Sequence, residues 1–335
     1  MNKNLIFFRK LEIKKFISNI HTDNFRSCNL GGYEFKSSIL TPLYITGISD
    51  GEGSFQITIQ DNKGMGKTGY KPFLEFKVTQ RDHSVSILYE IKKYFGCGRI
   101  NIDNSKTATM KFVITNNSDL MYKVIPHFDK YPLKTSKFLN YLNFKSAVIL
   151  MNEKKHYDLN GINNLRVIKS NMNTFRSYKE KFDYCWSKDI IIEPEWLQGF
   201  IDGEGSFQCE MYFSNKIKNY PQINFSLQIQ QNNHDVAVLY AIKNFLQCGY
   251  LKPKYDIRNL KIGLSSKRTI TGLWIRNYEV ICRFVDLYPL YTIKRFDYLD
   301  WKRLIELKKV KAYLYKEGLE LMKKIKNSMN NKRFK

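Results

Sequence analysis

Apolar and polar residues alternate over several short segments of the chain, which is the pattern of β-strands with one covered face. Phe55, Ile57 and Ile59 alternate with polar residues, and the same pattern recurs over 207–213 and 222–230. Side chains at every second position of a strand lie on one face of a sheet. The pattern therefore predicts strands whose apolar face covers a core, while the other face carries mostly amide and hydroxyl groups.

Glycine-rich apolar segments at 44–53 and 196–205 precede these strands and are compatible with helices. Each half then continues with a second strand, a helix, two further short strands and closing helices. The later helices are predicted at 84–95, 119–129, 134–151, 235–246, 277–286 and 291–309. Each half therefore follows the order α-β-β-α-β-β-α, which predicts an α+β domain with one antiparallel sheet and helices on one face.

The chain repeats itself, which indicates one domain duplicated in tandem. The sequence DGEGSFQ occurs twice, and longer stretches around VTQRDHSVSILYEIKKYFGCG and YPLKTSKFLNYLNF recur at nearly the same spacing. The matching segments are 50–56 with 202–208, 78–98 with 229–249, and 131–144 with 288–301. The predicted organisation is an N-terminal extension at 1–39, a first repeat at 40–175, a linker at 176–192, and a second repeat at 193–335 that ends in a basic tail.

Composition adds a partner class to this picture. Hydrophobic residues make up 43% of the 335 residues, enough for a real core, and the net charge is +24. The hydrophobic content excludes a disordered basic protein. The positive charge favours a polyanion as the binding partner, and nucleic acid is favoured over a membrane surface. No apolar run is long enough to span a bilayer. The six cysteines form no C-x-x-C pair, which favours a reducing compartment and indicates neither a zinc site nor a disulfide framework.

Two glycines lie four residues apart in each copy of the repeated motif: Gly47 and Gly51 in the first, Gly199 and Gly203 in the second. Residues at i and i+4 share one face of a helix. Without side chains on that face, two helices can approach more closely than the usual 8–10 Å between axes. Gly47 and Gly199 are therefore predicted to form the interface between the two motif helices.

One acid follows each glycine pair, at Glu52 and Glu204. If the two helices pack together, these carboxylates meet across a pseudo-two-fold axis and repel unless a cation neutralises them. Carboxylate oxygens suit Mg²⁺. The alternative is that the acids merely end a helix and stay solvated, while the glycines mark turns. The recurrence of the motif in equivalent repeat positions favours the metal site.

The segments ITGISDGEG (45–53) and LQGFIDGEG (197–205) resemble the LAGLIDADG motif of homing endonucleases and group I intron maturases. Thr46 and Gln198 replace the small Ala of that motif, and Ser49 replaces an apolar residue. The resemblance implies two αββαββα halves with the motif helices between them and both sheets forming a saddle over DNA. It also implies an enzyme that cleaves double-stranded DNA with Mg²⁺ at a long asymmetric site and leaves 3′ overhangs. Because both halves lie in one chain, this enzyme is expected to be a monomer.

The resemblance assigns roles to particular positions. Metal would be held by the carboxylates of Glu52 and Glu204 and by the backbone carbonyls of Gly51 and Gly203. YPLKTSK (131–137) and YPLYTIK (288–294) resemble the stretch that carries an active-site lysine, here Lys137 and Lys294. These fit ordinary surface lysines as well, and Lys134 is a rival in the first half. Gln80 and Gln231 would lie beside an active-site water, or would simply be polar residues at strand ends.

The outward face of each sheet offers side chains that could contact base edges in the major groove. The candidates are Gln56, Thr58, Gln60, Lys71, Glu75, Lys77 and Arg99 in the first half, and Gln208, Glu210, Gln222, Asn224, Ser226, Gln228, Gln230 and Lys252 in the second. They differ between the halves, so an asymmetric target is expected. The basic tail, with Lys323, Lys324, Lys326, Lys332 and Arg333, is expected to serve phosphates or solubility.

Two other functions fit the same sequence. A maturase would bind intron RNA through the basic surface with weak or lost cleavage, and a DNA-binding regulator would have lost catalysis altogether. The presence of both Glu52 and Glu204 favours the nuclease, since neither alternative needs the acids. The abundance of residues with AT-rich codons, together with the resemblance, predicts an organellar protein of the mitochondrion with no membrane partner.

Overall fold

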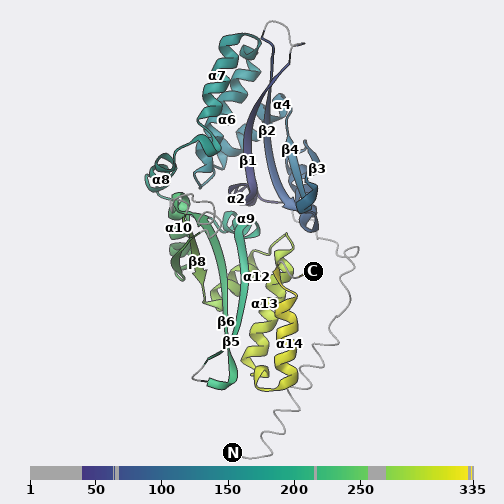
Figure 1. Ribbon diagram of the computed structural model, residues 1–335, viewed down its shortest axis with the longest axis vertical. Helices are drawn as coiled ribbons and strands as arrows, with labels where there is room; N and C mark the ends of the chain where they lie inside the picture. The colour runs from purple at the N-terminus through teal and green to yellow at the C-terminus, as the bar shows by residue number, and fades with distance from the viewer. Residues whose placement is uncertain are drawn as a thin grey trace, which may run out of the picture. The chain divides into compact units, whose positions relative to one another are not determined.

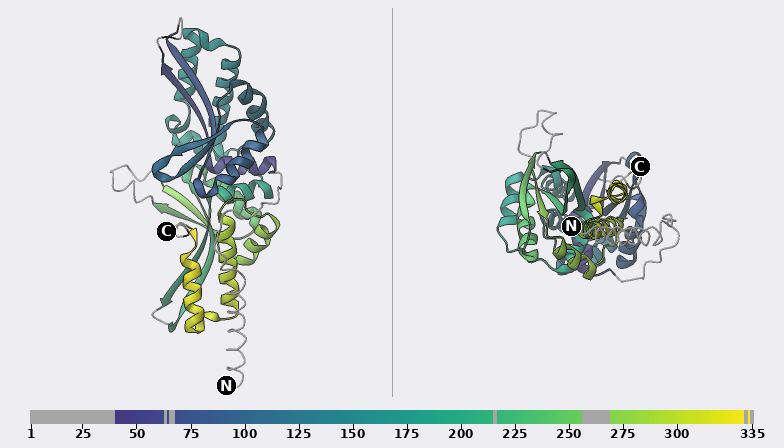
Figure 2. Two further views of the ribbon diagram at one scale, coloured as in Figure 1. Left: turned by 90° about the vertical axis from the view of Figure 1, so that its right-hand side faces the viewer. Right: turned by 90° about the horizontal axis from the view of Figure 1, so that it is seen from below.

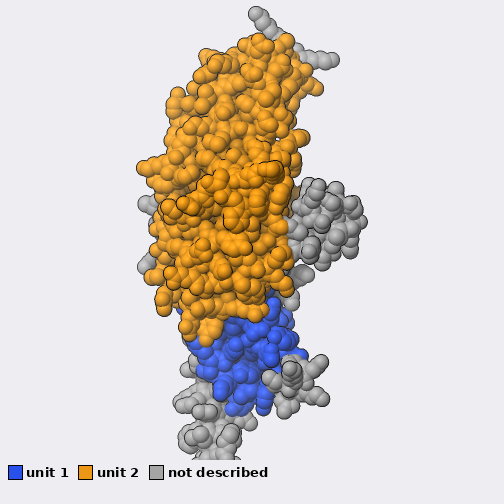
Figure 3. Space-filling model, turned by 90° about the vertical axis from the view of Figure 1, so that its left-hand side faces the viewer, with its two compact units in different colours: residues 1–38, 207–225, 296–335 blue, residues 39–206, 226–295 orange. Residues whose placement is uncertain are grey.

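The computed structural model describes residues 40–62, 64, 68–214, 217–255, 269–330 and 333. The predicted N-terminal extension and Lys332 of the predicted tail lie outside these residues. The chain forms two compact units (Figure 3), a larger one of 39–206 with 226–295 and a smaller one of 207–225 with 296–335. The chain passes between them inside two strands and one helix, so the units differ from the sequence repeats. The domain boundaries drawn from those repeats stay predictions.

The two motif segments form helices in the larger unit, α2 (Pro42–Glu52) and α9 (Pro194–Glu204), as predicted. Each begins with proline, whose fixed φ suits the first helical turn. In α2 the Thr41 hydroxyl also caps the helix by accepting a hydrogen bond from the Tyr44 amide at 3.2 Å. Each helix ends at the acid of the motif, and a strand begins at the next residue.

Glycine is needed at both helix-to-strand junctions. A Cβ added to Gly53 would lie 2.6 Å from the Ser49 carbonyl oxygen, and one added to Gly205 would lie 2.7 Å from the Ile201 carbonyl oxygen. Both distances are below any ordinary contact, so a side chain there would push the strand away from the helix. The junction fixes the acid at the last helical residue, directly before the sheet.

The first sheet lies wholly in the larger unit and has the order β1-β2-β4-β3, with every pair antiparallel. Its strands are β1 (Gly53–Asp61), β2 (Tyr70–Arg81), β3 (Arg99–Asn104) and β4 (Thr109–Ile114). Figure 2 shows β1 and β2 as a long curved hairpin. Helices α3 (Val85–Phe95), α6 (Lys137–Asn152) and α7 (Leu159–Ser170) belong to the same unit, and Figure 1 shows α6 and α7 along one face of the hairpin.

Aromatic rings fill the core between this sheet and its helices. Phe55 of β1 lies 5.2 Å from Phe76 of β2 and 5.2 Å from Phe144 of α6, measured between ring centroids, and all three are fully buried. Phe55 is an inward position of the alternating pattern, and Ile57 is buried as well, so the predicted covered face of β1 is confirmed.

The second sheet repeats the strand order of the first, as β5-β6-β8-β7. Its strands are β5 (Gly205–Ser214), β6 (Ile217–Asn232), β7 (Tyr250–Tyr255) and β8 (Thr269–Ile275), with helices α10 (Val236–Leu246) and α12 (Tyr278–Leu287). The predicted α+β class, with two αββαββα halves and two antiparallel sheets, is confirmed. Within the described residues, no helix is both long and apolar enough to span a bilayer.

Some helices differ from the prediction. The segment predicted as one helix at 119–129 comprises α4 (Asn117–Asp119), a π-helical turn (Leu120–Val124) and α5 (Ile125–Lys130). The helices α7 and α14 (Lys316–Asn327) were not predicted. Neither was α8 (Tyr178–Trp186), which lies inside the segment 176–192 predicted as a linker and is capped by the Ser177 hydroxyl.

The smaller unit has its own aromatic core, built by parts of β5 and β6 with most of α13 (Lys294–Lys309) and with α14 (Lys316–Asn327). Trp301 is fully buried, and its ring lies 5.6 Å from Phe207 and 5.7 Å from Phe225. The guanidinium of Arg333 donates hydrogen bonds to Asp297 and Asp300. The expectation that Arg333 serves phosphates or solubility is therefore wrong, because Arg333 pairs with two carboxylates in the first two turns of α13.

Candidate active site

The helices α2 and α9 touch through their backbones. A Cβ added to Gly47 would lie 2.0 Å from the Trp196 carbonyl oxygen, and one added to Gly199 would lie 2.2 Å from the Tyr44 carbonyl oxygen. No side chain fits at either position. The close helix contact predicted from Gly47 and Gly199 is therefore present, and it fixes the relative position of the two motif helices.

The second glycine pair brings the acids together at the end of this contact. A Cβ added to Gly51 would lie 3.3 Å from Glu204 Cγ, and one added to Gly203 would lie 3.5 Å from Glu52 Cγ. Each acid thus lies against the glycine that precedes the other acid. The pairing expected from the pseudo-two-fold symmetry is what the chain forms.

The two carboxylates are costly to ionise together. Burial raises the pKa of Glu52 to about 6, and Glu204 acts in the same direction, while Lys294 and Lys137 act against the rise. Burial also raises the pKa of Glu204, opposed by Lys294, Lys137 and a hydrogen bond from Gln231. Two acids with raised pKa values that share one site favour any ligand that brings positive charge.

A lysine from each half reaches the end of its own motif helix. Lys137 Nζ donates to the carbonyl oxygens of Ser49 at 2.9 Å and Gly51 at 3.1 Å. Lys294 Nζ makes the equivalent bonds to the carbonyl oxygens of Ile201, at 3.3 Å, and Gly203. Cations are favourable at a helix C-terminus, where the carbonyl groups have no helical partner.

The rival lysine of the first half lies elsewhere. Lys134 Nζ is 2.7 Å from the carboxylate of Glu193 and lies 5.6 Å from the centre of the Trp196 ring. Its ammonium is therefore held at the start of α9, whereas the acids lie at the end of that helix. Of the two lysines in YPLKTSK, the structure brings only Lys137 to the acid pair.

The first acid of each motif holds the lysine loop in place, a role that sequence reasoning missed. Asp50 is buried and accepts hydrogen bonds from the Lys134 amide at 2.8 Å, the Thr135 amide at 3.1 Å and the Thr135 hydroxyl at 2.6 Å. It also accepts from the indole of Trp196 on α9 at 2.8 Å. Asp50 thus ties its own lysine loop to the opposite motif helix.

Asp202 does the same in the second half. It accepts from the amides of Tyr291 and Thr292, at 2.8 and 3.2 Å, from the Thr292 hydroxyl, and from the Tyr44 hydroxyl of α2 at 2.8 Å. The signal was visible in the sequence, because Asp and Thr occupy the same places in both copies of DGEG and YPLxT.

The residues that depart from the small Ala of the motif also hold these loops. The Thr46 hydroxyl donates to the Tyr131 carbonyl oxygen at 3.0 Å, and Gln198 Nε2 donates to the Pro289 carbonyl oxygen at 2.6 Å. Thr46 Oγ1 also lies 3.2 Å from Nε2 of His127, whose pKa burial lowers to about 3. His127 is therefore neutral and part of the support of α2. Sequence reasoning gave it no role.

The two glutamines differ. The side chain of Gln231 forms a hydrogen bond with Glu204. In contrast, Nε2 of Gln80 is buried and has no hydrogen-bond partner among the described residues. The repeat equivalence that suggested one role for both therefore hides a difference between the halves.

Comparison with known proteins accounts for this arrangement. The sequence profile of the LAGLIDADG endonuclease family matches residues 45–148 and 197–305, which include most of both motif helices and both lysines. The chain belongs to the LAGLIDADG endonuclease family.

Relatives and solved structures agree with this family. "Probable intron-encoded endonuclease 3" of Neurospora crassa is 27% identical and covers 84% of this chain and 52% of its own length. "Uncharacterized mitochondrial protein RF1" of Saccharomyces cerevisiae is 24% identical over 100% of this chain and 66% of its own length. The chain thus spans about half to two thirds of these curated relatives. The structure of I-SmaMI bound to uncleaved DNA with calcium ions is 28% identical, with a TM-score of 0.75, over 87% of this chain and 99% of that chain.

The outward face of the first LAGLIDADG half carries charged pairs. Lys77 Nζ lies 3.5 Å from Asp103 and 3.8 Å from Glu75, and Lys111 Nζ lies 3.4 Å from Asp103. The register places Gln56 opposite Glu75, on the same face. Of the other DNA-contact candidates in this half, Thr58, Gln60 and Arg99 are exposed and Lys71 is half-buried.

The corresponding face of β6 and β8 in the larger unit is less accessible. Ser226 and Gln228 are 5% and 9% exposed, and Gln228 Nε2 donates to Ser226 Oγ at 3.3 Å. Trp274 lies opposite Gln228 in the register and stacks on Tyr250 with ring centroids 6.0 Å apart. The expectation that Ser226 and Gln228 are exposed outward is therefore wrong. Gln230 is half-buried and Lys252 is exposed.

The remaining candidates lie in the smaller unit. Glu210 is exposed and Gln208 half-buried. Gln222 and Asn224 share one partner, since the Tyr212 hydroxyl donates to Gln222 Oε1 at 2.8 Å and lies 3.2 Å from Asn224 Nδ2. These amides form a polar row along β6, on the face opposite the aromatic core of this unit.

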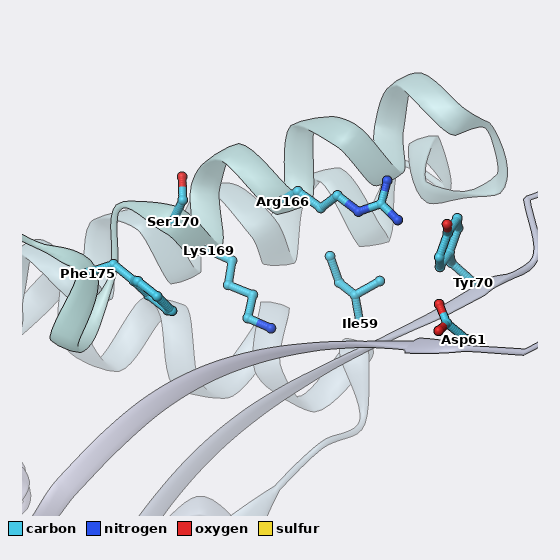
Figure 4. Close-up of a pocket in the computed structure, with 7 residues that line it drawn as sticks. All are labelled: Ile59, Asp61, Tyr70, Arg166, Lys169, Ser170 and Phe175. Carbon is cyan, nitrogen blue, oxygen red and sulfur yellow. The ribbon is translucent and has the colours of Figure 1, made fainter.

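A separate pocket of about 270 Å³ lies beside α7 and the far end of β1. Figure 4 shows Arg166 and Lys169 of α7 facing Ile59 and Asp61, and the Arg166 guanidinium lies 4.2 Å from the centre of the Tyr70 ring. This pocket is at the opposite end of β1 from Glu52, so it is not part of the acid pair.

Proposed function

We propose that the chain is a homing endonuclease that cleaves double-stranded DNA at a long asymmetric site. The observation that carries this proposal is the buried pair Glu52 and Glu204, held together by a backbone contact between helices and flanked by one lysine from each half. A solved structure of the similar protein I-SmaMI is bound to cleaved DNA. That chemistry needs neutralisation of charge at phosphorus, which this site is built to provide.

The residues present fit a hard divalent cation. Among the described residues, no group of three or more His, Cys, Asp or Glu side chains could hold a metal. The donor set is oxygen only: the carboxylates of Glu52 and Glu204 and the carbonyls of Gly51 and Gly203 would hold Mg²⁺. A carbonyl oxygen has two lone pairs, so a cation and the lysine ammonium can share it. Bound there, Mg²⁺ would lower the pKa of a water molecule and neutralise phosphate charge.

The protein groups contribute orientation and charge. Lys137 and Lys294 place one ammonium in each half, within reach of a phosphate that approaches the acids. Asp50 and Asp202 hold the two lysine loops, so neither lysine needs to be ordered when DNA binds. Gln231, bonded to Glu204, and Gln80 would orient the attacking water. Charged groups that are fixed in place before the reaction stabilise the charge of the transition state without having to reorganise, and this is a major source of rate enhancement in enzymes.

The target is proposed to be asymmetric because the two sheet faces differ. Charged groups dominate the first face, while an aromatic pair and buried amides occupy the second. The net charge of +24 would serve the phosphates of the duplex. One chain contains both halves, so a monomer is proposed to act, with its sheets as the DNA-binding saddle. No observation on the described residues favours the splicing function with intron RNA.

The experiment that tests this function uses a randomised duplex library. The chain is incubated with the library and Mg²⁺, and the ends of any cut molecules are sequenced. We expect one long recurrent target, cut on both strands with short 3′ overhangs. The double variant E52Q/E204Q is the control and should release no ends. Cleavage by this variant, or no cleavage by the wild type, would overturn the proposal.

A mitochondrial site of action, supported by the relative from yeast mitochondria, is tested by locating the tagged chain in fractionated cells.

A further inference from the structure

Asp235 is a buried carboxylate of the second repeat that binds a loop of the first. It ends a short 3₁₀ turn (Asn233–Asp235) before α10 and is 6% exposed. One carboxylate oxygen accepts from the Ser136 amide at 2.6 Å, and the other lies 3.2 Å from the Ser136 hydroxyl. Ser136 immediately precedes Lys137, the lysine that reaches the acid pair.

Several groups face this carboxylate in the larger unit. Besides Ser136, they are the Cys185 thiol of α8, which donates at 3.1 Å, and Nε2 of His234 at 3.1 Å. Burial acts to raise the pKa of Asp235, but hydrogen bonds from His234, Ser136 and Cys185 hold it below its ordinary value. A buried charge is tolerated only with such partners, and removal of the charge would leave the Ser136 amide without its acceptor.

The equivalent position in the first repeat is a neutral residue. Ser84 aligns with Asp235, and Ile293, which precedes Lys294, aligns with Ser136. Ser84 Oγ accepts one hydrogen bond from the Ile293 amide at 3.4 Å, near the limit for such a bond. The cross-repeat contact before Lys137 therefore consists of two bonds to the Asp235 carboxylate. The equivalent contact before Lys294 is one long bond to the Ser84 hydroxyl.

This contact acts on a loop that is already fixed at the neighbouring residue. Asp50 holds Thr135 and Asp235 holds Ser136, so two buried carboxylates from opposite repeats define where α6 begins. Lys137 is the first residue of that helix, and its Nζ reaches the carbonyl of Gly51. A displacement of Ser136 would be transmitted directly to the backbone of Lys137.

We propose that Asp235, a residue of the second repeat, is a positioning residue for Lys137 of the first. Cleavage of the two DNA strands therefore depends unequally on contact between the repeats. This inference rests on the proposed endonuclease function. Its consequence is that loss of Asp235 slows cleavage of the DNA strand served by Lys137. Cleavage of the DNA strand served by Lys294 depends instead on the weaker contact of Ser84.

The test measures both strand cleavages separately, in single turnover, at saturating concentration of the duplex that the wild type cuts from the library. The variant K137M identifies the strand served by Lys137. We expect D235A to slow that strand by about 10- to 100-fold, because small misplacements of a reacting group have effects of this size. The other strand should stay within about threefold, and DNA affinity with Ca²⁺ in place of Mg²⁺ should be unchanged, since no DNA contact is removed.

Matched variants separate positioning from general damage. D235N keeps an acceptor oxygen for the Ser136 amide and should recover part of the lost rate. S84A should slow only the other strand, and by a few-fold. D189A removes an equal charge from an exposed position and should change neither strand. Hydrogen–deuterium exchange of residues 131–138 should increase in D235A and not in D189A, which reports loop order without any cleavage.

The outcomes that overturn the inference differ from those that overturn the function. A wild type that cuts neither strand of any library member overturns the proposed function and this inference with it. A wild type that cuts, beside a D235A variant that cuts both strands at the wild-type rate or slows both equally, overturns the inference alone. A D235N variant no better than D235A, with unchanged exchange of the loop, does the same.

Discussion

The two repeats carry the same chemistry but support it differently. Glu204 has a hydrogen bond from Gln231, whereas the matching amide of Gln80 has no partner among the described residues and gives Glu52 no such bond. Ser136, which precedes Lys137, is held by the carboxylate of Asp235. Ile293, which precedes Lys294, is held by the hydroxyl of Ser84. The shared motif fixes which groups meet, while divergence around it has changed how firmly each is held. The following predictions test how far this difference extends.

The largest effect is expected at the acids. E52Q and E204Q should each reduce cleavage by orders of magnitude, because a neutral amide is a poor ligand for Mg²⁺, while DNA binding is retained. The assay is a supercoiled plasmid that carries the target, analysed on a gel with Mg²⁺ and again with Ca²⁺. If the repeats are independent, one variant should nick the plasmid; if they share one ion, both strands should fail together. Full linearisation by either variant would contradict the metal site.

The next largest effect is expected at the contact between α2 and α9. G47L and G199L should each lower the free energy of unfolding by about 3 kcal/mol or more, since the new side chain meets backbone atoms that cannot move aside. Urea denaturation measures the loss. G64A, at an exposed loop position, is the control and should stay near the wild type. Wild-type stability in both leucine variants would show that the helices do not pack as closely as the structure has them.

The raised pKa of Glu52 predicts a pH-dependent gain in stability for E52Q. The folded chain takes up a proton on Glu52 more readily than the unfolded chain does, so ionisation weakens the fold as pH rises through about 4.5 to 6. A shift of this size corresponds to about 2 kcal/mol. Measured with chelator present, E52Q should therefore be more stable than the wild type at pH 7, and the two should converge near about pH 4. A difference that is constant with pH would contradict the burial of the acid pair.

The smallest effect separates the two glutamines. Q231L removes a hydrogen bond to a buried acid and should cost about 1–2 kcal/mol at pH 7. Q80L replaces an amide that has no partner among the described residues, and it should be neutral or slightly stabilising. Paired denaturant titrations compare the two variants. Equal losses would mean that the repeats support their acids in the same way.

Local patterns predicted the features that depend on local rules. The spacing of Gly47 and Gly51 predicted the helix contact, and the period of two predicted the strands and their covered faces. Burial of Gln228 could not be foreseen, because alternation identifies a face and not what lies across it, here the aromatic pair with Trp274 and Tyr250. The helix α8 was missed because its segment has no counterpart in the other repeat.

Contacts between distant residues account for the rest. The recurrence of Asp50 and Thr135 in both repeats marks them as paired positions, but only the structure shows that Thr135 donates a hydrogen bond to Asp50. The substitution of Ser84 by Asp235 is visible when the repeats are aligned, but its partner Ser136 belongs to a different segment of the other repeat. Sequence comparison within the chain could flag the difference without indicating what it touches.

The contact of Gly47 and Gly199 has a consequence for how such a chain can evolve. At both positions the nearest atoms are backbone atoms of the opposite helix. Every amino acid supplies those atoms, so the contact places little demand on the identity of the residues it meets. After gene duplication, each half could change side chains around this contact and still keep it, apart from the side chains that bond across the repeats, such as Trp196 to Asp50 and Tyr44 to Asp202. Halves from different relatives should for the same reason recombine into working hybrids, provided that both glycines and these bonding partners are present.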